Sequence, residues 1–181
     1  MTAGEPPLCV DLDGTLIDGD TLYLAVAQLA RERPWAILLL PFALLRGRAR
    51  LKRAVSDRVR LDPARLPYRA SVLGFLREER ARGRRLLLAT AADHRIAGAV
   101  ATHLGLFDGV IASEGVHNAK GAGKVAAIRA VLGAAEFDYM GDHQADLPVL
   151  RAARQGYLVA PRAGLLVRAR AECRIERVFP G

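Results

Sequence analysis

From residue 68 onward, short apolar runs alternate with longer segments whose apolar residues recur at helical spacing. This alternation predicts right-handed β–α–β units, which build a parallel sheet with helices on both of its faces. We expect strands at 8–12, 85–90, 109–112, 137–140, 157–160 and 174–178. We expect helices at 68–82, 94–104, 122–132, 147–153 and 165–171. The fold class that follows is α/β.

The stretch between the first strand and residue 68 departs from this alternation. We expect three helices there, at about 21–33, 34–45 and 51–60. Pro41 should kink or interrupt the second of them, because proline has no amide proton and clashes with the preceding turn. We therefore divide the chain into a core of residues 1–17 and 68–181 and a small helical insert of residues 18–67.

The most apolar piece of the chain, residues 35–45, lies in this insert. Five basic residues follow it directly: Arg46, Arg48, Arg50, Lys52 and Arg53. The piece is too short to span a bilayer. A hydrophobic helix with basic flanks can lie at a membrane surface beside anionic headgroups. It can equally be buried inside a helical subdomain, and the sequence leaves both interpretations open.

Composition limits the partners and the location. The chain has 181 residues, 51% of them hydrophobic, which is enough for one domain with a sizeable core. Its formal net charge of +8 favours anionic partners such as phosphorylated substrates or lipid headgroups. The basic residues show neither zinc-finger spacing nor interleaved aromatics, so we expect no nucleic-acid partner. Cys9 and Cys173 form no CxxC pair, and we expect reduced thiols in a cytoplasmic protein.

Two carboxylates follow the first strand, in the stretch Asp11-Leu-Asp13-Gly-Thr. Alternate residues of a strand point the same way, so Asp11 and Asp13 should share one face at the strand's carboxyl end. Paired carboxylates repel each other, and a hard cation such as Mg²⁺ would relieve that repulsion. One carboxylate could then act as nucleophile and the other as general acid and base. The alternative is an ordinary Asp-Gly turn.

Three later positions carry groups suited to the same chemistry. Thr90 ends the second strand, where its hydroxyl and the backbone amide of Ala91 could bind a phosphate oxygen, although a threonine there can also simply cap a turn. Lys120 and Lys124 lie in a glycine-bearing loop that enters a helix. A lysine there could neutralise a phosphoryl group or a carboxylate, or both lysines could be solvated.

The stretch Gly141-Asp142-His-Gln-Ala-Asp146 has the same pattern as the stretch after the first strand, because its carboxylates directly follow an apolar run. Asp142 is a candidate metal ligand. Asp146 could bind the metal through water, or hold the lysine in place.

Together these pieces resemble the haloacid dehalogenase-like superfamily, in its phosphatase branch. Residues 11–15 resemble the family's DxDGT motif, Thr90 its second motif, Lys120 its third and residues 141–146 its GDxxxD motif. Lys124 is the alternative for the third motif, because sequence alone does not fix the register of that loop. The resemblance implies a Rossmann-like parallel sheet, with the helical insert of residues 18–67 as a small cap.

The resemblance also implies a Mg²⁺-dependent mechanism with an aspartyl-phosphate intermediate. Asp11 would be the nucleophile, and Asp13 would protonate the leaving oxygen and later activate water. The Asp11 carboxylate, the Asp13 carbonyl and Asp142 would hold Mg²⁺. Thr90, Ala91 and Lys120 would hold the phosphoryl group, with Asp146 and Lys124 in support. A phosphotransferase using the same intermediate and a non-catalytic adaptor domain are the alternatives.

Several phrases further resemble the phosphatase-like domain that is fused ahead of UbiA-type prenyltransferases. They include Asp18-Gly-Asp-Thr-Leu, Pro34-Trp-Ala, Asn118-Ala-Lys-Gly and Phe137-Asp-Tyr-Met-Gly-Asp. This resemblance implies a lipid-linked or phosphoribosyl substrate, association with a membrane prenyltransferase, and peripheral contact of the cap with the inner face of the membrane. The chain would be either a free-standing relative or the soluble part of a longer membrane protein.

Overall fold

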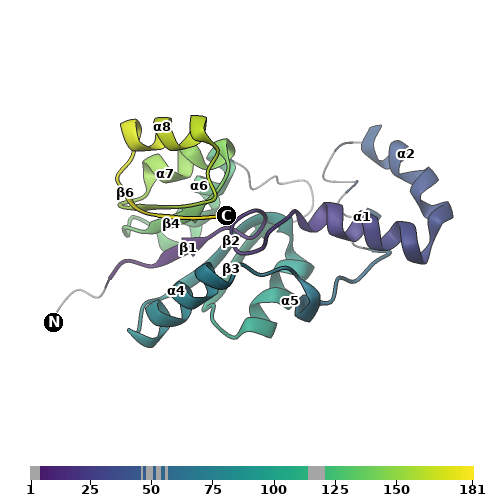
Figure 1. Cartoon of the computed structure of the whole chain (residues 1–181), viewed down its shortest axis with the longest axis horizontal. Helices are drawn as coiled ribbons and strands as arrows, with labels where there is room; N and C mark the ends of the chain where they lie inside the picture. The colour runs from purple at the N-terminus through teal and green to yellow at the C-terminus, as the bar shows by residue number, and fades with distance from the viewer. Residues whose placement is uncertain (1–4, 46, 48–50, 52–53, 56, 114–120) are drawn as a thin grey trace.

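The computed structural model describes residues 5–45, 47, 51, 54–55, 57–113 and 121–181. Its centre is a six-stranded sheet in which every neighbouring pair is parallel, in the order β3-β2-β1-β4-β5-β6 (Figure 1). The strands are β1 (Leu8–Val10), β2 (Leu86–Asp93), β3 (Gly109–Ser113), β4 (Asp138–Gly141), β5 (Gly156–Val159) and β6 (Ile175–Phe179). The chain order reverses between β1 and β4, so these two strands meet at the centre of the sheet.

Helices cover both faces of the sheet, as Figure 1 shows. On one face lie α4 (Ala70–Ala81) and α5 (His94–Leu104). On the other lie α6 (Ala122–Leu132), α7 (Leu147–Ala152) and α8 (Ala163–Glu172). Strand β1 alternates between the two cores, because Leu8 and Val10 pack on the α4 and α5 side and Cys9 packs on the other. The predicted α/β fold with a Rossmann-like parallel sheet is confirmed.

The segment between β1 and α4 leaves and rejoins the sheet region at adjacent points. The amide of Asp18 donates to the carbonyl of Pro67 at 2.8 Å, and a β-bridge joins Ile17 to Tyr68. Between these points lie α1 (Thr21–Glu32), η1 (Pro34–Leu39), α2 (Leu40–Leu45) and η2 (Pro63–Arg65). The helix expected at 51–60 lies partly outside the described residues, and Asp57 is already in a turn.

A small core of its own holds this segment together. Leu29, Ala36 and Val59 are buried against one another, and Ile37 and Leu40 pack around them. The predicted interruption by proline is present, because the helix changes from 3₁₀ to α between Leu39 and Leu40. Pro41 then falls in the first turn of α2, where no amide donor is needed. Within the described part of the chain, every helix is too short or too polar to cross a membrane.

At the opposite end of the strands, a buried ion network ties β4 to α4. The guanidinium of Arg84 pairs with Asp138 and donates to Glu79 at 2.7 Å, and all three side chains are almost fully buried. Arg154 donates to Asp138 from the other side at 2.7 Å. Buried charges are tolerated only when they are paired in this way, so the network should be costly to break.

Candidate active site

The carboxyl ends of β1 and β4 bring three carboxylates together. Asp11 follows β1 directly, and its amide donates to the carbonyl of Met140 in β4 at 3.0 Å. Asp142 follows β4, and Asp146 lies one turn later, in η3 (Gln144–Asp146). One carboxylate oxygen from each of Asp11, Asp142 and Asp146 lies within 4.8 Å of the others. The predicted convergence of Asp11 and Asp142 is therefore present in the structure.

The turn after β1 packs directly against Asp142. Gly14 has a φ of +78°, and a Cβ built on it would lie 2.2 Å from Oδ2 of Asp142. Thr15 donates its hydroxyl to Oδ1 of Asp142 at 3.0 Å. Both the backbone conformation and the close approach require glycine at position 14. The Asp-Gly-Thr turn thus fixes the position of a carboxylate that is distant in sequence.

Lys124 lies at the centre of the cluster. It stands in the first turn of α6 and is only 2% exposed. Its Nζ lies 3.0 Å from Oδ1 of Asp11 and 3.1 Å from Oδ1 of Asp146. It also donates to the hydroxyl of Tyr139 at 2.7 Å. Lys124 therefore occupies the place beside the first carboxylate that we expected Lys120 to take. Lys120 itself lies outside the described residues.

Both oxygens of Asp146 are engaged within the protein. Oδ1 accepts from Lys124 and from the hydroxyl of Tyr139 at 2.8 Å. Oδ2 accepts from the amide of His143 at 3.1 Å. Asp146 therefore holds Lys124 in place, which is one of the two roles we considered for it. Asp11 and Asp142 are the carboxylates better placed to accept a metal directly.

The electrostatics of the site favour a bound cation. Burial, opposed by the charge of Lys124 and reinforced by the nearby carboxylates, raises the pKa of Asp11 to about 7. Burial and the charge of Asp146 raise the pKa of Asp142 to about 6. Burial alone would lower the pKa of Lys124, but Asp11 and Asp146 outweigh it and raise this pKa above its usual value. Lys124 pairs with Asp11 and Asp146, and one ammonium cannot balance the negative charge of three carboxylates. Their oxygens are the hard ligands that Mg²⁺ prefers. The residues present therefore fit Mg²⁺.

Asp13 lies two residues after Asp11, and Thr90 lies in β2, the strand that pairs with β1. The carboxylate of Asp13 accepts from the amide of Thr21 at 2.7 Å, which ties it to the first turn of α1. Thr90 is buried near the carboxyl end of β2, and its hydroxyl accepts from the amide of Ala92 at 3.0 Å. The register of β2 with β3 shifts between Ala89 and Asp93, so the backbone around Ala91 leaves the regular ladder.

Sequence reasoning missed two side chains of the site. Tyr139 lies in the middle of β4, where a buried aromatic is normally a core residue, and nothing in the sequence indicates that its hydroxyl faces Lys124. Thr15 belongs to the motif of residues 11–15, but the sequence indicates no contact for its hydroxyl. Its hydrogen bond to Asp142 spans 127 positions, and only the packing of β1 beside β4 reveals it.

Comparison with known proteins identifies related sequences. The model of the family described as haloacid dehalogenase-like hydrolase matches residues 8–151. The uncharacterized protein y4nM of Sinorhizobium fredii (strain NBRC 101917 / NGR234) is 38% identical over 153 residues, which are 84% of this chain and 30% of that protein. The chain thus spans less than a third of the curated relative it matches.

Solved structures share the fold. A protein of unknown function from Bordetella pertussis Tohama I has a TM-score of 0.73 at 21% identity, covering 94% of this chain and 97% of that one. A phospho-aspartyl intermediate analogue of phosphoserine phosphatase has a TM-score of 0.62 at 13% identity, covering 98% and 94%. A HAD family hydrolase from Salmonella enterica subsp. enterica serovar Typhi has a TM-score of 0.64 at 15% identity, covering 94% and 67%.

Proposed function

The chain belongs to the haloacid dehalogenase-like hydrolase family, and on that premise we propose that it hydrolyses phosphomonoesters through an aspartyl-phosphate intermediate. The observation that carries the proposal is the buried contact of Asp11 with Lys124, 3.0 Å apart, beside Asp142. A nucleophilic carboxylate must be ionised and must face the phosphorus without repelling it. Lys124 stabilises the anion of Asp11 and is close enough to neutralise a phosphoryl group bound in front of it.

In the first step, a carboxylate oxygen of Asp11 forms a bond to phosphorus, and the bond from phosphorus to the ester oxygen breaks. Asp13 gives its proton to that departing oxygen, so the alcohol leaves neutral. In the second step, Asp13 takes a proton from water, and the water oxygen attacks phosphorus. Inorganic phosphate leaves, and the Asp11 carboxylate is regenerated.

The Asp11 carboxylate, the backbone carbonyl of Asp13 and the Asp142 carboxylate would hold Mg²⁺. The ion would supply positive charge that offsets the repulsion between these carboxylates and the phosphoryl oxygens. Asp146 and Tyr139 keep Lys124 directed at Asp11. Thr90 and the backbone of Ala91 lie at the carboxyl end of the neighbouring strand, where we place the remaining phosphoryl oxygens.

We further propose that residues 18–67 act as a cap over this site. Two contacts support this role. The Asp13 carboxylate accepts from the first turn of α1, and Arg69 pairs with Asp18 at 2.7 Å where the segment rejoins the core. A movement of α1 would therefore change the position of the Asp13 carboxylate, the proposed acid for the leaving group. Such a cap excludes water and selects the leaving group.

The resemblance to domains fused to prenyltransferases supports a finer proposal. We place the protein in the cytoplasm, at the inner face of the membrane, in association with a membrane prenyltransferase. Its substrate would be a lipid-linked or phosphoribosyl phosphomonoester. Copurification of the full chain with such an enzyme from solubilised membranes would support the partnership, and its absence under mild detergent would count against it.

The activity is tested by Asp11→Asn against Asp62→Asn in a Mg²⁺-dependent assay on a panel of phosphomonoesters. We expect the first variant to lose turnover by several orders of magnitude, because the amide is no nucleophile. Asp62 caps η2 by accepting from the amide of Ala64, and asparagine caps equally well, so the second variant should keep full activity. Comparable activity in the two variants would refute the assignment of Asp11.

A further inference from the structure

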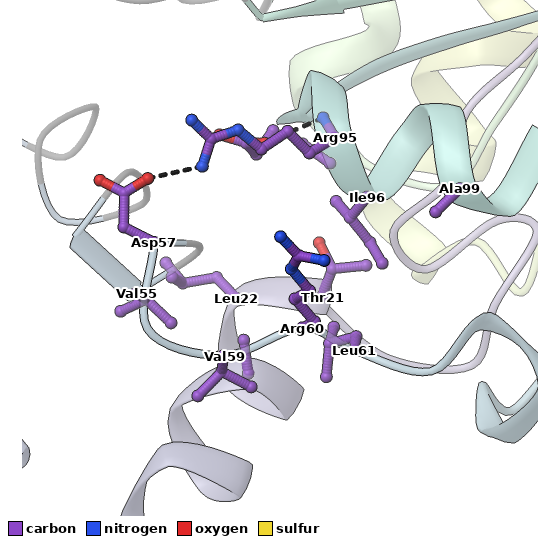
Figure 2. A pocket seen from close by; sticks show the side chains of 13 residues that line it. Thr21, Leu22, Val55, Asp57, Val59, Arg60, Leu61, Arg95, Ile96 and Ala99 are labelled. Carbon is purple, nitrogen blue, oxygen red and sulfur yellow. Dashed lines mark hydrogen bonds and ion pairs between the residues drawn. The ribbon is translucent and has the colours of Figure 1, made fainter.

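A cavity of about 440 Å³ lies between the 18–67 segment and the core. Figure 2 shows side chains from α1, from residues 55–61 and from α5 converging on it. Most of its lining is aliphatic, including Leu22, Ala25, Val55, Val59, Leu61 and Ile96. The volume falls in the range of small-molecule binding pockets. Nothing in the catalytic cluster described above uses this space.

The cavity adjoins the reacting groups. Thr21 lines it, and the amide of Thr21 donates to the Asp13 carboxylate at 2.7 Å. Ala92 lines it as well, and the amide of Ala92 donates to the hydroxyl of Thr90 at 3.0 Å. A phosphoryl group held by Thr90 would therefore carry its ester oxygen towards Asp13 and the rest of its alcohol into the cavity.

Four charged side chains line the cavity: Asp57, Arg60, Asp93 and Arg95. Asp57 and Arg95 pair at 2.5 Å across the gap between the insert and α5, as the dashed line in Figure 2 marks. Asp93 caps α5 by accepting from the amide of Arg95 at 2.9 Å. Asp57, Arg60 and Arg95 are exposed to solvent, so they offer no buried partner to the ammonium and carboxylate of an amino acid. The aliphatic walls instead favour an apolar occupant.

We propose that this cavity binds the leaving group and that the preferred substrates are phosphomonoesters of apolar alcohols. This proposal rests on the proposed phosphatase activity and narrows it to a substrate class. Each methylene moved from water into the cavity should raise kcat/KM by about fourfold, until the cavity is filled.

The test is a series of straight-chain alkyl phosphates of increasing length, with phosphoserine as the polar comparison. These esters have leaving alcohols of similar reactivity, so differences in kcat/KM report binding in the cavity. Leu22→Asn and Ile96→Asn should flatten the rise of kcat/KM with chain length, because each replaces an aliphatic part of the lining with an amide. Val167→Asn is the matched control, because Val167 is exposed on α8 and distant from the cavity lining.

Calorimetric binding of the same alkyl phosphates to Asp11→Asn gives a readout that needs no turnover. Hydrolysis of esters without any dependence on chain length, or a preference for phosphoserine, would overturn the cavity proposal and leave the phosphatase proposal intact. If binding depends on chain length but the unmodified protein hydrolyses none of the esters, the phosphatase proposal is overturned and binding of apolar groups in the cavity is supported.

A second inference comes from an exposed apolar face on η1 and α2. The face consists of Trp35, Leu38, Leu39, Phe42, Leu44 and Leu45, whose residues are all at least 45% exposed. The other side of the same segment, with Ala36, packs on the small core around Leu29. Figure 1 shows α2 at the end of the molecule remote from the sheet. So many large side chains exposed together indicate an interaction surface.

Charge indicates what covers this face. Between Glu32 and Asp57 the sequence contains no acidic residue and six basic ones, at positions 33, 46, 48, 50, 52 and 53. A segment of this composition repels a second copy of itself and is complementary to an anionic lipid surface. We infer that this face lies in the interface of an anionic membrane, with its aromatic and leucine side chains among the headgroups and upper acyl chains.

Trp35 is the only tryptophan of the chain, so its fluorescence reports directly on this face. Vesicles of phosphatidylcholine and phosphatidylglycerol in equal parts should shift its emission to shorter wavelength and carry the protein upward in flotation. Phosphatidylcholine alone should bind far less, and added salt should weaken binding. Leu38→Glu and Phe42→Glu should each weaken vesicle binding by about tenfold or more. Val167→Glu, which adds the same charge to an exposed valine elsewhere, should retain most of the binding.

An unchanged Trp35 emission with anionic vesicles would overturn this inference. So would a stable dimer in sedimentation that Leu38→Glu dissociates, because the face would then be covered by a second copy. Since the substituted side chains are exposed, loss of folding should not complicate either result.

Discussion

The contact of Gly14 with Asp142 allows a sharp test of the site's geometry. Gly14 and Gly83 have nearly the same φ, +78° and +82°. A Cβ on Gly83 would have no heavy atom within 4 Å, whereas a Cβ on Gly14 would lie 2.2 Å from an Asp142 oxygen. Alanine at either position should cost about 1 kcal/mol of stability for the left-handed backbone. Only Gly14→Ala must also displace the carboxylate.

The required displacement is about 1 Å, because real Cβ contacts closer than 3.0 Å are essentially never seen. A misplacement of about 1 Å at a catalytic group can lower the rate by about a hundredfold. We therefore expect Gly14→Ala to lower kcat/KM by about that factor and to weaken Mg²⁺ binding, while Gly83→Ala keeps both. Calorimetric titration with Mg²⁺, steady-state kinetics and thermal unfolding of the two variants measure these effects. Equal Mg²⁺ affinity and equal kcat/KM in the two variants would refute the assigned role of Asp142.

Three further predictions concern charge and hydrogen bonding. Burial raises the pKa of Asp11 to about 7 and that of Asp142 to about 6, so in the folded, metal-free protein both carboxyls keep their protons to a higher pH than in the unfolded chain. When the folded-state pKa is raised, the stabilisation is present at low pH and is lost as the pH rises through the folded-state pKa. The metal-free protein should therefore lose stability between about pH 4 and pH 7. For the same reason, Mg²⁺ should raise Tm more at about pH 8 than at about pH 5. A pH-independent gain in Tm would contradict this. Arg84→Met should cost about 3–5 kcal/mol in urea unfolding, because it removes a buried partner from both Asp138 and Glu79. Arg151→Met breaks an exposed pair with Glu172 and should lower the free energy of unfolding by less than about 1 kcal/mol. Equal losses in Arg84→Met and Arg151→Met would show that the buried network is not stabilising. Tyr139→Phe should lower kcat by about tenfold with little change in KM, because it removes a hydroxyl that orients Lys124 and Asp146. An unchanged kcat would show that Asp146 alone is enough to orient Lys124.

The order of strands and helices could be predicted because each obeys a simple periodicity. Buried parallel strands are continuous apolar runs, and the helices between them carry apolar residues at helical spacing. The helices 94–104 and 122–132 begin and end where the sequence predicted them. The 18–67 segment was harder, because its apolar residues exceed what its small core can bury. The sequence could not decide which of them are exposed.

The convergence of Asp11 and Asp142 was predictable for a related reason. Asp11 and Asp142 each follow an apolar run directly, and parallel strands deliver their carboxyl ends to one edge of the sheet. The choice between Lys120 and Lys124 was less certain, because the sequence does not fix at which residue the loop ends and the helix begins. Only the first turn of α6 shows that Lys124 is directed inward at Asp11. The cavity beside Thr21 depends on how three separate segments pack, which no local pattern records.

If Asp11 attacks phosphorus, the phosphorylated protein can be trapped during turnover. The full chain is mixed with Mg²⁺ and a phosphomonoester, quenched in acid within one turnover, digested and examined by mass spectrometry. We expect one phosphoryl group on the peptide that contains Asp11, dependent on Mg²⁺ and absent from Asp11→Asn. A phosphoryl group on another residue, or Asp11→Asn protein that still turns over substrate, would contradict it.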